Sequence, residues 1–328
     1  MNKRILGKSN MNISEIALGT WQVGGKWGSN FDYVNADRII NGALDKGVNF
    51  IDTADVYSDG ESEKAVGKAA RGRSEKIYVA TKCGRQINPH VSAGYTPKVL
   101  RKYVEDSLKR TGLERLDLVQ LHCPPTEVYY RPEIFSLFDD LKKEGKIANL
   151  GVSVEKIEEA IKAIEFDNVT SVQIIFNIFR QRPAELFFNM AKKKNVGVIV
   201  RVPLASGLLT GKFGKSTRFE AGDHRNFNRD GKAFDKGETF AGVPYELGLE
   251  AVEEIKSIFP PDASLAQLAL RWVLMFDAVS TVIPGASSPE QAEANCAAAA
   301  LPPLTETQMK ALKTLYDGKI KPLVHHLW

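Results

Sequence analysis

Cysteine is scarce in this sequence: Cys83, Cys123 and Cys296 are the only three in 328 residues, and no two of them have CxxC spacing. This usage fits a reducing compartment better than a disulfide framework, so we expect a cytoplasmic protein. The five histidines form no HxH or HExxH arrangement, which leaves a hydrolytic metal site without support. We therefore expect no metal.

A strong charge imbalance and long apolar runs are also missing. The net charge is only +4, and the charges are mixed along the chain, so neither nucleic acid nor a membrane is expected as a partner. The first ten residues, MNKRILGKSN, lack the long apolar region of a signal peptide. The most apolar later stretch, SLAQLALRWVLMF, is interrupted by Arg271 and is too short to span a bilayer.

What the sequence does contain is a regular alternation of strand-like and helix-like segments. Eight apolar runs have the character of buried strands: 15–20, 48–54, 76–83, 116–123, 147–154, 171–177, 197–203 and 280–285. Amphipathic segments follow most of them, for example 37–47, 97–112, 133–146, 155–165 and 184–194. The alternation predicts an α/β fold with a parallel sheet, and eight such units in this length predict a closed (β/α)8 TIM barrel.

Other features refine the predicted fold. Residues 4–7 and 13–19 flank a polar turn and predict a short N-terminal β-hairpin. The first strand is not followed by GxGxxG, which disfavours an open dinucleotide-binding sheet. No break in composition marks a domain boundary, so residues 1–328 are expected to form a single domain. The irregular stretch 205–243 after the seventh strand is a long loop of the kind that often acts as a lid.

Polar residues stand where the predicted strands end. Asp52 ends the second strand, Lys82 the third and His122 the fourth. In a barrel of this type the chemistry lies at the carboxyl ends of the strands, so these three side chains should converge. A buried lysine needs a partner, and Asp52 is the expected one. Polar residues also end the fifth to seventh strands: Ser153, Gln173, Asn177 and Arg201.

Each of these residues alone also has an ordinary structural explanation. A strand-end aspartate is more often a helix cap than a catalyst, and a lone histidine is more often a satisfied core residue. The combination is harder to explain by chance, because Tyr57 follows Asp52 by five residues in NFIDTADVY. Tyr78 and Lys82 match the YxxxK signature of short-chain dehydrogenases, but in a strand these positions lie about 13 Å apart, so we interpret Tyr78 as packing.

Several longer motifs make the sequence resemble the aldo-keto reductase superfamily over essentially its whole length. The motifs are LGTW (18–21), FIDTADVYSDGESEKAVGKA (50–69), VATKCG (79–84), LDLVQLH (116–122), GKIANLGVS (145–153), VQIIFN (172–177), PLASGLLTGKF (203–213) and IPGASSPEQAEAN (283–295). The nearest subgroup resembles the bacterial aldo-keto reductase 11 family. The resemblance implies a carbonyl reductase whose catalytic tetrad falls on Asp52, Tyr57, Lys82 and His122.

In such a tetrad, Tyr57 would donate a proton to the carbonyl oxygen while hydride reaches the carbonyl carbon. An unperturbed tyrosine has a pKa of about 10, and Lys82, held positive by Asp52, would act to lower it. His122 would orient the carbonyl group or share the proton. We expect Trp21, Tyr57, His122 and Tyr129 to contact the substrate. Trp27 and Tyr130 are further pocket candidates, although each aromatic is equally compatible with loop packing.

The resemblance further implies an extended nicotinamide dinucleotide across the barrel mouth. Ser153 and Gln173 would hold the carboxamide, residues 203–209 with Lys212 would close over the pyrophosphate, and Ser288-Pro289 would begin a helix near the adenosine end. The complete set of expected cofactor residues is Gly19, Thr20, Trp21, Asp52, Ser153, Gln173, Arg201, Pro203, Leu204, Ser206, Gly207, Lys212, Arg225, Gly285, Ser287, Gln291 and Asn295.

The sequence departs from the family pattern at two places. Residues 285–291, GASSPEQ, contain no cation to grip a 2′-phosphate, so NADP(H) is expected on family habit with NAD(H) not excluded. Arg201 stands where relatives usually have Trp or Tyr. A guanidinium there could stack on the nicotinamide. The alternative is that Arg201 turns away into a salt bridge, for example with a loop carboxylate.

Two other functions stay open at this point. One is an NAD-dependent polyol or sugar dehydrogenase working in the oxidative direction, which the cation-free segment 285–291 permits. The other is a cofactor-sensing binding protein, because potassium-channel β subunits resemble these enzymes. The complete tetrad favours an enzyme that acts on a small carbonyl substrate. We expect a monomer or a weak homo-oligomer.

Overall fold

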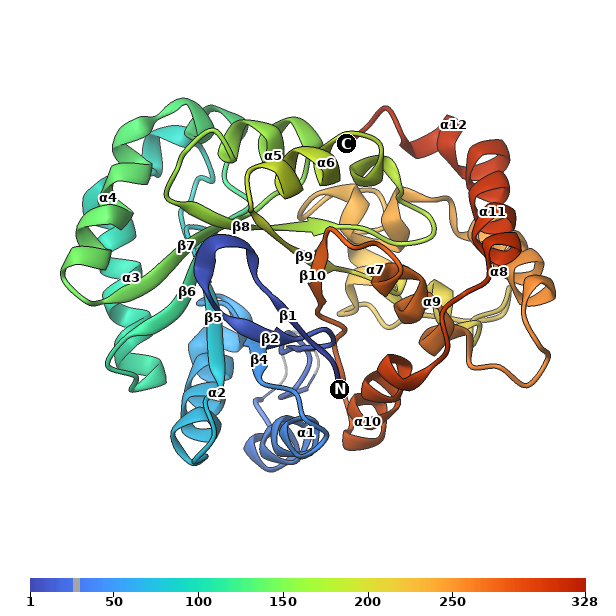
Figure 1. Ribbon diagram of the computed structural model, residues 1–328, viewed down its shortest axis with the longest axis horizontal. Coiled ribbons are helices and arrows are strands. Elements are labelled where there is room, and N and C mark those ends of the chain that lie inside the picture. Colours follow the sequence, from blue (N-terminus) through green and yellow to red (C-terminus); the bar gives the residue numbers. More distant parts are fainter. Residues whose placement is uncertain (26–29) are drawn as a thin grey trace.

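The expected barrel is present in the computed structural model, which describes residues 1–25 and 30–328 and so excludes the position of Trp27. Within those residues eight strands form one parallel sheet in the order β10-β9-β8-β7-β6-β5-β4-β3 (Figure 1). The strands are β3 (Leu18–Gly19), β4 (Phe50–Asp52), β5 (Tyr78–Cys83), β6 (Leu116–His122), β7 (Ile147–Ser153), β8 (Val169–Ile175), β9 (Gly197–Arg201) and β10 (Val279–Val282).

Backbone hydrogen bonds between the first and last strands close this sheet into a barrel. The amide of Ala17 donates to the carbonyl of Val282 at 2.9 Å, and the amide of Gly19 donates to the carbonyl of Pro284 at 3.0 Å. The two chain segments approach so closely that a Cβ atom on Gly19 would lie 2.9 Å from the carbonyl oxygen of Ile283. Glycine at position 19 is therefore required by the closure itself.

Helices surround the barrel, and most of them connect one strand to the next. They are α1 (Tyr33–Asp45), α2 (Glu61–Arg71), α3 (Pro97–Thr111), α4 (Pro132–Lys143), α5 (Ile157–Ala163), α6 (Phe187–Lys193), α7 (His224–Phe227), α8 (Tyr245–Ile258), α9 (Leu265–Leu274), α10 (Pro289–Ala297), α11 (Glu306–Leu315) and α12 (Lys321–Val324). Helix α3 shows why these segments are helical. The Thr96 side chain caps it, Pro97 occupies its first turn, and Gly112 ends it with a φ of 63°.

The predicted hairpin consists of β1 (Lys3–Ile5) and β2 (Asn12–Ser14), paired antiparallel. Leu6, Met11 and Ile13 from the hairpin form one buried cluster with inward-facing residues of the barrel strands. The strand residues of that cluster are Phe50, Ala80, Leu118 and Ile199, together with Ala17 and Ile283 beside β3 and β10. The hairpin therefore plugs the amino-terminal end of the barrel with apolar side chains and leaves the opposite end for the functional groups.

The stretch 205–243 is more ordered than a plain loop. It contains α7 and three short 3-10 turns at Ala205–Thr210, Lys236–Glu238 and Phe240–Gly242. Ser206 ties its two ends together: its hydroxyl donates to the carbonyl of Glu238 at 2.9 Å and accepts from the amide of Phe240 at 3.1 Å. The segment is thus a folded excursion held against the barrel mouth.

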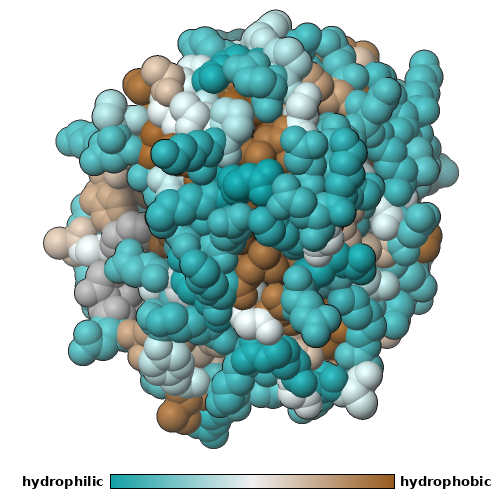
Figure 2. Space-filling view, turned by 90° about the vertical axis from the view of Figure 1, so that its left-hand side faces the viewer, coloured by the Kyte–Doolittle hydropathy of each residue, from teal (hydrophilic) through white to brown (hydrophobic). Residues whose placement is uncertain are grey.

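The outer surface is polar on the side that carries α3 and α4 in Figure 1. Hydrophilic residues cover most of that face, and hydrophobic residues appear only as separate small areas (Figure 2). Among the described residues, no helix combines the length and the apolar character that crossing a bilayer requires.

The plug generates a stability prediction. Replacing Leu6, which has no exposed surface, with Ala should lower the free energy of unfolding by about 2–5 kcal/mol, because a cavity is left in a closed barrel end. Urea denaturation followed by circular dichroism measures the loss. The matched control is Ile5→Ala, since Ile5 is 55% exposed and its removal opens no cavity. Equal losses for the two variants would contradict the plug.

Candidate active site

The strands of the barrel carry an apolar layer followed by a polar layer. Side chains of a strand alternate between its two faces, so residues two apart point the same way. Phe50, Ala80 and Leu118 belong to the buried cluster that Leu6, Met11 and Ile13 of the hairpin complete, which we call the plug cluster. The residues two positions later are Asp52, Lys82 and Gln120. Gln173 on β8 joins this second layer by hydrogen bonding. The sheet thus delivers a carboxylate, an ammonium and two amides to one level inside the barrel.

Asp52 and Lys82 form a salt bridge at this level, and both side chains are almost completely buried. The Lys82 ammonium also donates to the carbonyl of Thr53 at 2.9 Å and to the hydroxyl of Tyr57 at 3.2 Å. The second oxygen of Asp52 accepts hydrogen bonds from Gln120 at 3.0 Å and from Gln173 at 2.8 Å. Every polar atom of the pair therefore has a partner, which is the condition under which a buried charge pair is tolerated.

The pKa shifts of Lys82, Tyr57 and His122 determine which of these groups are protonated at neutral pH. Burial disfavours the charge of Lys82, but Asp52 and Tyr57 outweigh burial and raise the pKa of Lys82. Burial also raises the pKa of Tyr57, while Lys82 acts in the expected lowering direction without reversing the net shift. Burial, with Arg85 and Lys82, holds the pKa of His122 well below its usual range. At neutral pH the site contains an ammonium, a neutral phenol and a neutral imidazole.

Tyr57 and His122 line a cavity of about 680 Å³ at the mouth of the barrel. Their rings lie 6.1 Å apart, centre to centre, at an interplanar angle of 82°. The Nδ1 atom of His122 is buried without a hydrogen-bond partner among the described residues. The structure therefore brings the four predicted tetrad residues together, with Asp52 and Lys82 below and Tyr57 and His122 facing the space that a small molecule can enter.

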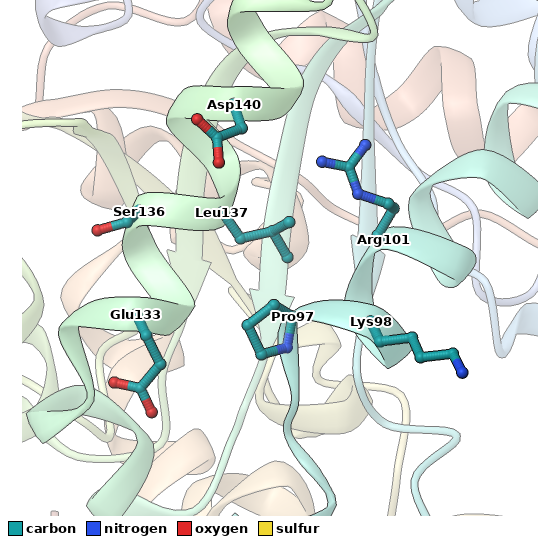
Figure 3. A pocket seen from close by; sticks show the side chains of 7 residues that line it. All are labelled: Pro97, Lys98, Arg101, Glu133, Ser136, Leu137 and Asp140. Atoms are coloured by element: carbon teal, nitrogen blue, oxygen red, sulfur yellow. The ribbon is translucent and has the colours of Figure 1, made fainter.

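A second hollow lies between α3 and α4 on the outside of the barrel. Pro97, Lys98 and Arg101 form one wall, and Glu133, Ser136, Leu137 and Asp140 form the other (Figure 3). It contains none of the strand-end side chains that form the polar layer. The cavity above Tyr57 is therefore the candidate active site.

The residues expected around a dinucleotide lie along the carboxyl ends of several strands. Thr20 donates from both its amide and its hydroxyl to the carbonyl of Asp52, each at 3.0 Å. Gly285 is bridged to Gly19, and Asn295 donates to the carbonyl of Gly285 at 3.1 Å. The Ser287 hydroxyl donates to Gln291 at 3.0 Å. Pro203, Leu204, Ser206 and Gly207 belong to the turn after β9, and Lys212 is exposed just beyond it.

Four of the expected residues have contacts that bear on their predicted roles. Ser153 is buried with its hydroxyl oxygen 3.5 Å from the Cys123 sulfur. Gln173 is engaged in the polar layer with Asp52 and Gln120. Arg225 is paired with Asp223, with a shortest distance of 2.5 Å. Tyr129 has no exposed surface and packs in the core, so the structure gives it no place on the cavity wall.

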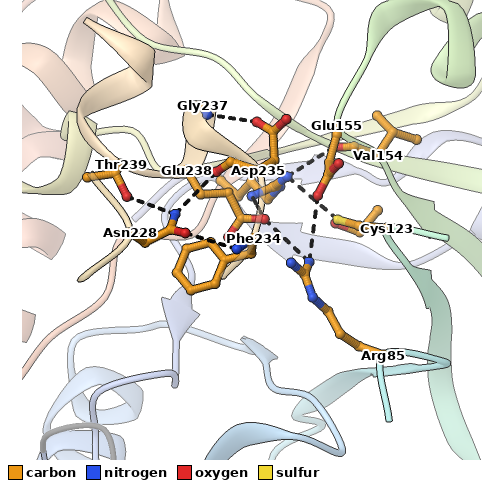
Figure 4. Close-up of polar contacts among 12 residues, drawn as sticks. Arg85, Cys123, Val154, Glu155, Asn228, Phe234, Asp235, Gly237, Glu238 and Thr239 are labelled. Atoms are coloured by element: carbon orange, nitrogen blue, oxygen red, sulfur yellow. Dashed lines mark hydrogen bonds and ion pairs between the residues drawn. The ribbon is translucent and has the colours of Figure 1, made fainter. Parts of the chain in front are cut away.

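Arg201 takes the second of its two anticipated arrangements. Its Nη1 atom lies 3.3 Å from Oε1 of Glu238, a carboxylate of the long segment after β9. Its Nη2 atom donates to the carbonyl of Val154 at 3.1 Å. Figure 4 shows this region, where Arg85 also approaches Glu155 and Glu238. The guanidinium is thus held in a salt bridge with a loop carboxylate.

Sequence reasoning missed several residues of the site. Gln120 precedes His122 by two positions, so the period of a strand would have placed both on one face. Arg85 and Glu155 each stand two residues after the end of a strand, β5 and β7, where a search beyond the strand ends would have found them. Phe227, Phe234 and Glu238 line the cavity from the long segment, and no sequence spacing indicates that they reach it.

Cys123, Glu155 and Glu238 offer ligand atoms within 4.8 Å of one another. A metal ion there would compete with the guanidiniums of Arg85 and Arg201, which already approach the same carboxylates. We therefore interpret the group as part of an ion-pair network.

The fold and the site define a (β/α)8-barrel oxidoreductase with an acid–base group at the mouth. The Tyr57 phenol and His122 imidazole at the cavity fit a carbonyl oxygen, and the polar groups from Thr20 after β3 to Asn295 in α10 fit a nicotinamide dinucleotide. The chain belongs to the Aldo/keto reductase family, whose family model matches residues 15–317.

Individual relatives agree with this assignment. The uncharacterized oxidoreductase YqkF of Bacillus subtilis is 31% identical, and the alignment covers 96% of each chain. The glycerol dehydrogenase AKR11B4 of Gluconobacter oxydans has a TM-score of 0.79 at 31% identity, over 97% of this chain and 96% of that one. The holo form of aldo-keto reductase AKR11C1 from Bacillus halodurans has a TM-score of 0.77 at 29% identity, over 96% of each.

A buried carboxylate beside the tetrad is not part of this acid–base group. Asp55 is 1% exposed, and neither of its oxygens has a hydrogen-bond partner among the described residues. Burial, reinforced by Glu63, raises the pKa of Asp55 to about 7. In the unfolded chain this pKa is about 4. The folded state therefore binds the proton more tightly and loses stability as the pH rises from about 4 to 7.

Replacing Asp55 with Asn should consequently raise the free energy of unfolding at pH 8 by a few kcal/mol, since each tenfold change in proton affinity is worth about 1.4 kcal/mol. The gain should shrink as the pH falls and vanish near pH 4, where Asp55 is protonated in both states. Urea denaturation across this pH range provides the measurement, with exposed Asp59→Asn as the control. A gain in stability that does not depend on pH would show that the pKa of Asp55 is the same in the folded and the unfolded state.

Proposed function

We propose that the protein reduces aldehydes and ketones to alcohols, with Tyr57 as the proton donor. The observation that carries the proposal is the hydrogen-bonded chain from Asp52 through Lys82 to Tyr57, which ends at a cavity also lined by His122. A nicotinamide dinucleotide, when bound, supplies hydride to the carbonyl carbon. The residues of the chain do the rest: they hold the substrate, polarise its oxygen and deliver a proton to it.

The order of the proton steps follows from the charges. Tyr57 is protonated at neutral pH, since the pKa of a tyrosine is about 10 and burial raises it further, so it can give its proton to the oxygen. The tyrosinate that remains lies beside the Lys82 ammonium, which stabilises the new negative charge. His122 is neutral and can donate one hydrogen bond to the same oxygen without competing as an acid. Asp52 acts through Lys82 and keeps it charged.

Tyr57→Phe should lower kcat for an aldehyde by about 10²–10⁴-fold, because general acid catalysis contributes about that much. Dissociation constants for the reduced cofactor should stay within a few-fold of the wild-type values, since the hydroxyl group alone is lost. Steady-state kinetics and fluorescence titration measure the two quantities. Tyr78→Phe is the matched control, because Tyr78 packs on the plug cluster. A Tyr57→Phe variant with near-wild-type kcat would remove Tyr57 from the mechanism.

For the cofactor we propose NADP(H), with Arg38 of α1 supplying the cation that residues 285–291 lack. Helix α1 packs against α10, and the side-chain amide of Asn35 donates to the backbone carbonyl of Ser287 at 3.2 Å. Arg38 lies one helical turn after Asn35, is exposed, and its charge acts on Glu290 at the start of α10. A guanidinium at that position can pair with a 2′-phosphate.

Arg38→Ala should therefore weaken NADPH binding by about tenfold, the usual scale for one charge-assisted hydrogen bond, and leave NADH binding unchanged. Fluorescence titration of both reduced cofactors gives the four dissociation constants. Arg101→Ala is a distant control, because Arg101 lies on α3. Tighter binding of NADH than NADPH by the wild-type protein would reject the NADP(H) preference. An equal loss for both cofactors would reject the role of Arg38.

Oxidation of polyols is the second candidate, favoured by the similarity to the glycerol dehydrogenase AKR11B4. The same tetrad serves it in reverse, with the tyrosinate accepting the alcohol proton. Comparing initial rates of reduction and oxidation with both cofactor pairs distinguishes the two directions. The three cysteines are free and buried, which supports the proposal of a cytoplasmic protein. We further propose that the chain is a single domain that acts as a monomer or weak homo-oligomer on a small carbonyl substrate.

A further inference from the structure

The segment 321–328 is fastened to the connection between β8 and α6. The guanidinium of Arg182 donates to the backbone carbonyl of Trp328. The Lys321 ammonium donates to Oε1 of Glu185 at 2.8 Å. Both acceptors and donors of this kind recur along the segment, so its backbone has a fixed place beside the barrel. The side chain of Trp328 is therefore aimed at a defined point.

The Trp328 ring contacts both a cation and a carboxylate. It is 5% exposed, and the guanidinium carbon of Arg180 lies 4.2 Å from the ring centre, a cation–π distance. The ring Nε1 atom donates to Oδ2 of Asp235 at 3.0 Å. Burial lowers the pKa of Arg180 to about 9, and the charge of Asp235 is the strongest influence against that shift. The guanidinium thus keeps its charge at neutral pH, beside the ring.

Two glycines let the ring approach the backbone of the segment after β9. A Cβ atom on Gly237 would lie 2.8 Å from Cε2 of Trp328 and 2.1 Å from Nη1 of Arg180. A Cβ atom on Gly242 would lie 2.3 Å from Cη2 of Trp328, and the φ of Gly242 is 77°. The ring therefore packs directly on the backbone of residues 237–242.

These contacts reach the wall of the substrate cavity through Asp235. Phe234, Asp235 and Glu238 line the cavity, whereas Trp328 does not. The second oxygen of Asp235 accepts from the amide of Gly237 at 2.7 Å (Figure 4). One carboxylate thus joins the Trp328 ring to the turn that carries the wall. Because that stretch is built from short turns and not from a strand or a long helix, side-chain contacts must hold it in place.

We propose that Trp328 is a positioning residue, which sets the affinity of the cavity for substrate by holding residues 234–238 at the barrel mouth. It acts through Asp235 and Gly237 and does not touch the substrate. The inference rests on the proposed carbonyl reduction and adds a residue that controls substrate binding in it. Without the ring, the substrate would have to order the wall as it binds, and that cost would appear in KM. The tetrad lies on the strands, so kcat should change little.

The first test measures the wall directly, in protein without cofactor or substrate. Hydrogen-exchange mass spectrometry can follow the amides of Glu238 and Thr239, which donate to the carbonyls of Asp235 and Lys236 at 3.0 Å each. In Trp328→Ala, residues 234–243 should exchange about 5–30-fold faster, the factor that one or two kcal/mol produces. Trp328→Phe keeps a ring on Arg180 and loses only the N–H donor, so its effect should be smaller.

Leu327→Ala is the matched control, because the neighbouring Leu327 is 40% exposed. Its exchange should equal that of the wild-type protein. Unchanged exchange of residues 234–243 in Trp328→Ala would overturn the inference. Faster exchange spread equally over the barrel strands would also overturn it, because Trp328 would then support the fold in general and not the wall.

The second test is kinetic and uses propanal with NADPH. Trp328→Ala should raise KM for propanal about 5–30-fold and change kcat by less than about threefold. Trp328→Phe should raise KM about fivefold, the scale of one hydrogen bond. A fall in kcat at constant KM would overturn the positioning role. If the wild-type protein reduces no aldehyde, the proposed reduction fails, and the exchange measurement still decides whether Trp328 holds the wall.

A double-mutant cycle tests the route through Asp235. If Trp328 acts on the wall by its hydrogen bond to Asp235, adding Trp328→Phe to Asp235→Asn should change KM by less than about twofold, because the contact is already lost. Effects of the two substitutions that simply multiply would show that they act independently, and would overturn the assignment of Asp235 as the link.

Discussion

The buried salt bridge between Lys82 and Asp52 is the interaction on which the rest of the site depends. Both side chains are removed from water, and such a pair is stable only when each remaining donor and acceptor is satisfied. Here Thr53, Tyr57, Gln120 and Gln173 supply those partners. The salt bridge therefore also constrains the residues around it. It requires amides from two other strands at the same level, and it directs the third donor bond of Lys82 to the phenol of Tyr57.

The barrel makes this arrangement possible by layering. The N-terminal hairpin and the residues beneath Asp52 and Lys82 form an apolar plug, so water cannot reach the charges from below. At the mouth, burial raises the pKa of Tyr57 and lowers that of His122. Closure of the barrel at Gly19 brings the end of β10 beside the end of β3.

Much of this could be predicted from the sequence because it follows from short-range periodicity. Asp52, Lys82 and His122 stand at strand ends, and strand ends in a parallel barrel converge. Gln120 obeys the same rule and could have been found. Glu238 and Phe234 could not, since they reach the cavity through the folded path of 205–243, and no local pattern encodes where that path returns. Arg201 was predictable in part. Its charge indicated that it needs a partner, but only the structure identifies that partner as Glu238.

The Arg201–Glu238 contact also links the two parts of the site. The tetrad is built on strands, and its geometry is set by backbone hydrogen bonds of the barrel. The opposite wall comes from the segment after β9, which Ser206 ties back at residues 238 and 240. A change in that segment can alter the cavity wall while leaving the strand-built tetrad in place. Glu238 stands where these two parts meet, because its carboxylate contacts Arg201 at the end of β9 and also lines the cavity. Two different stretches of the chain thus form the cavity, and one salt bridge joins them.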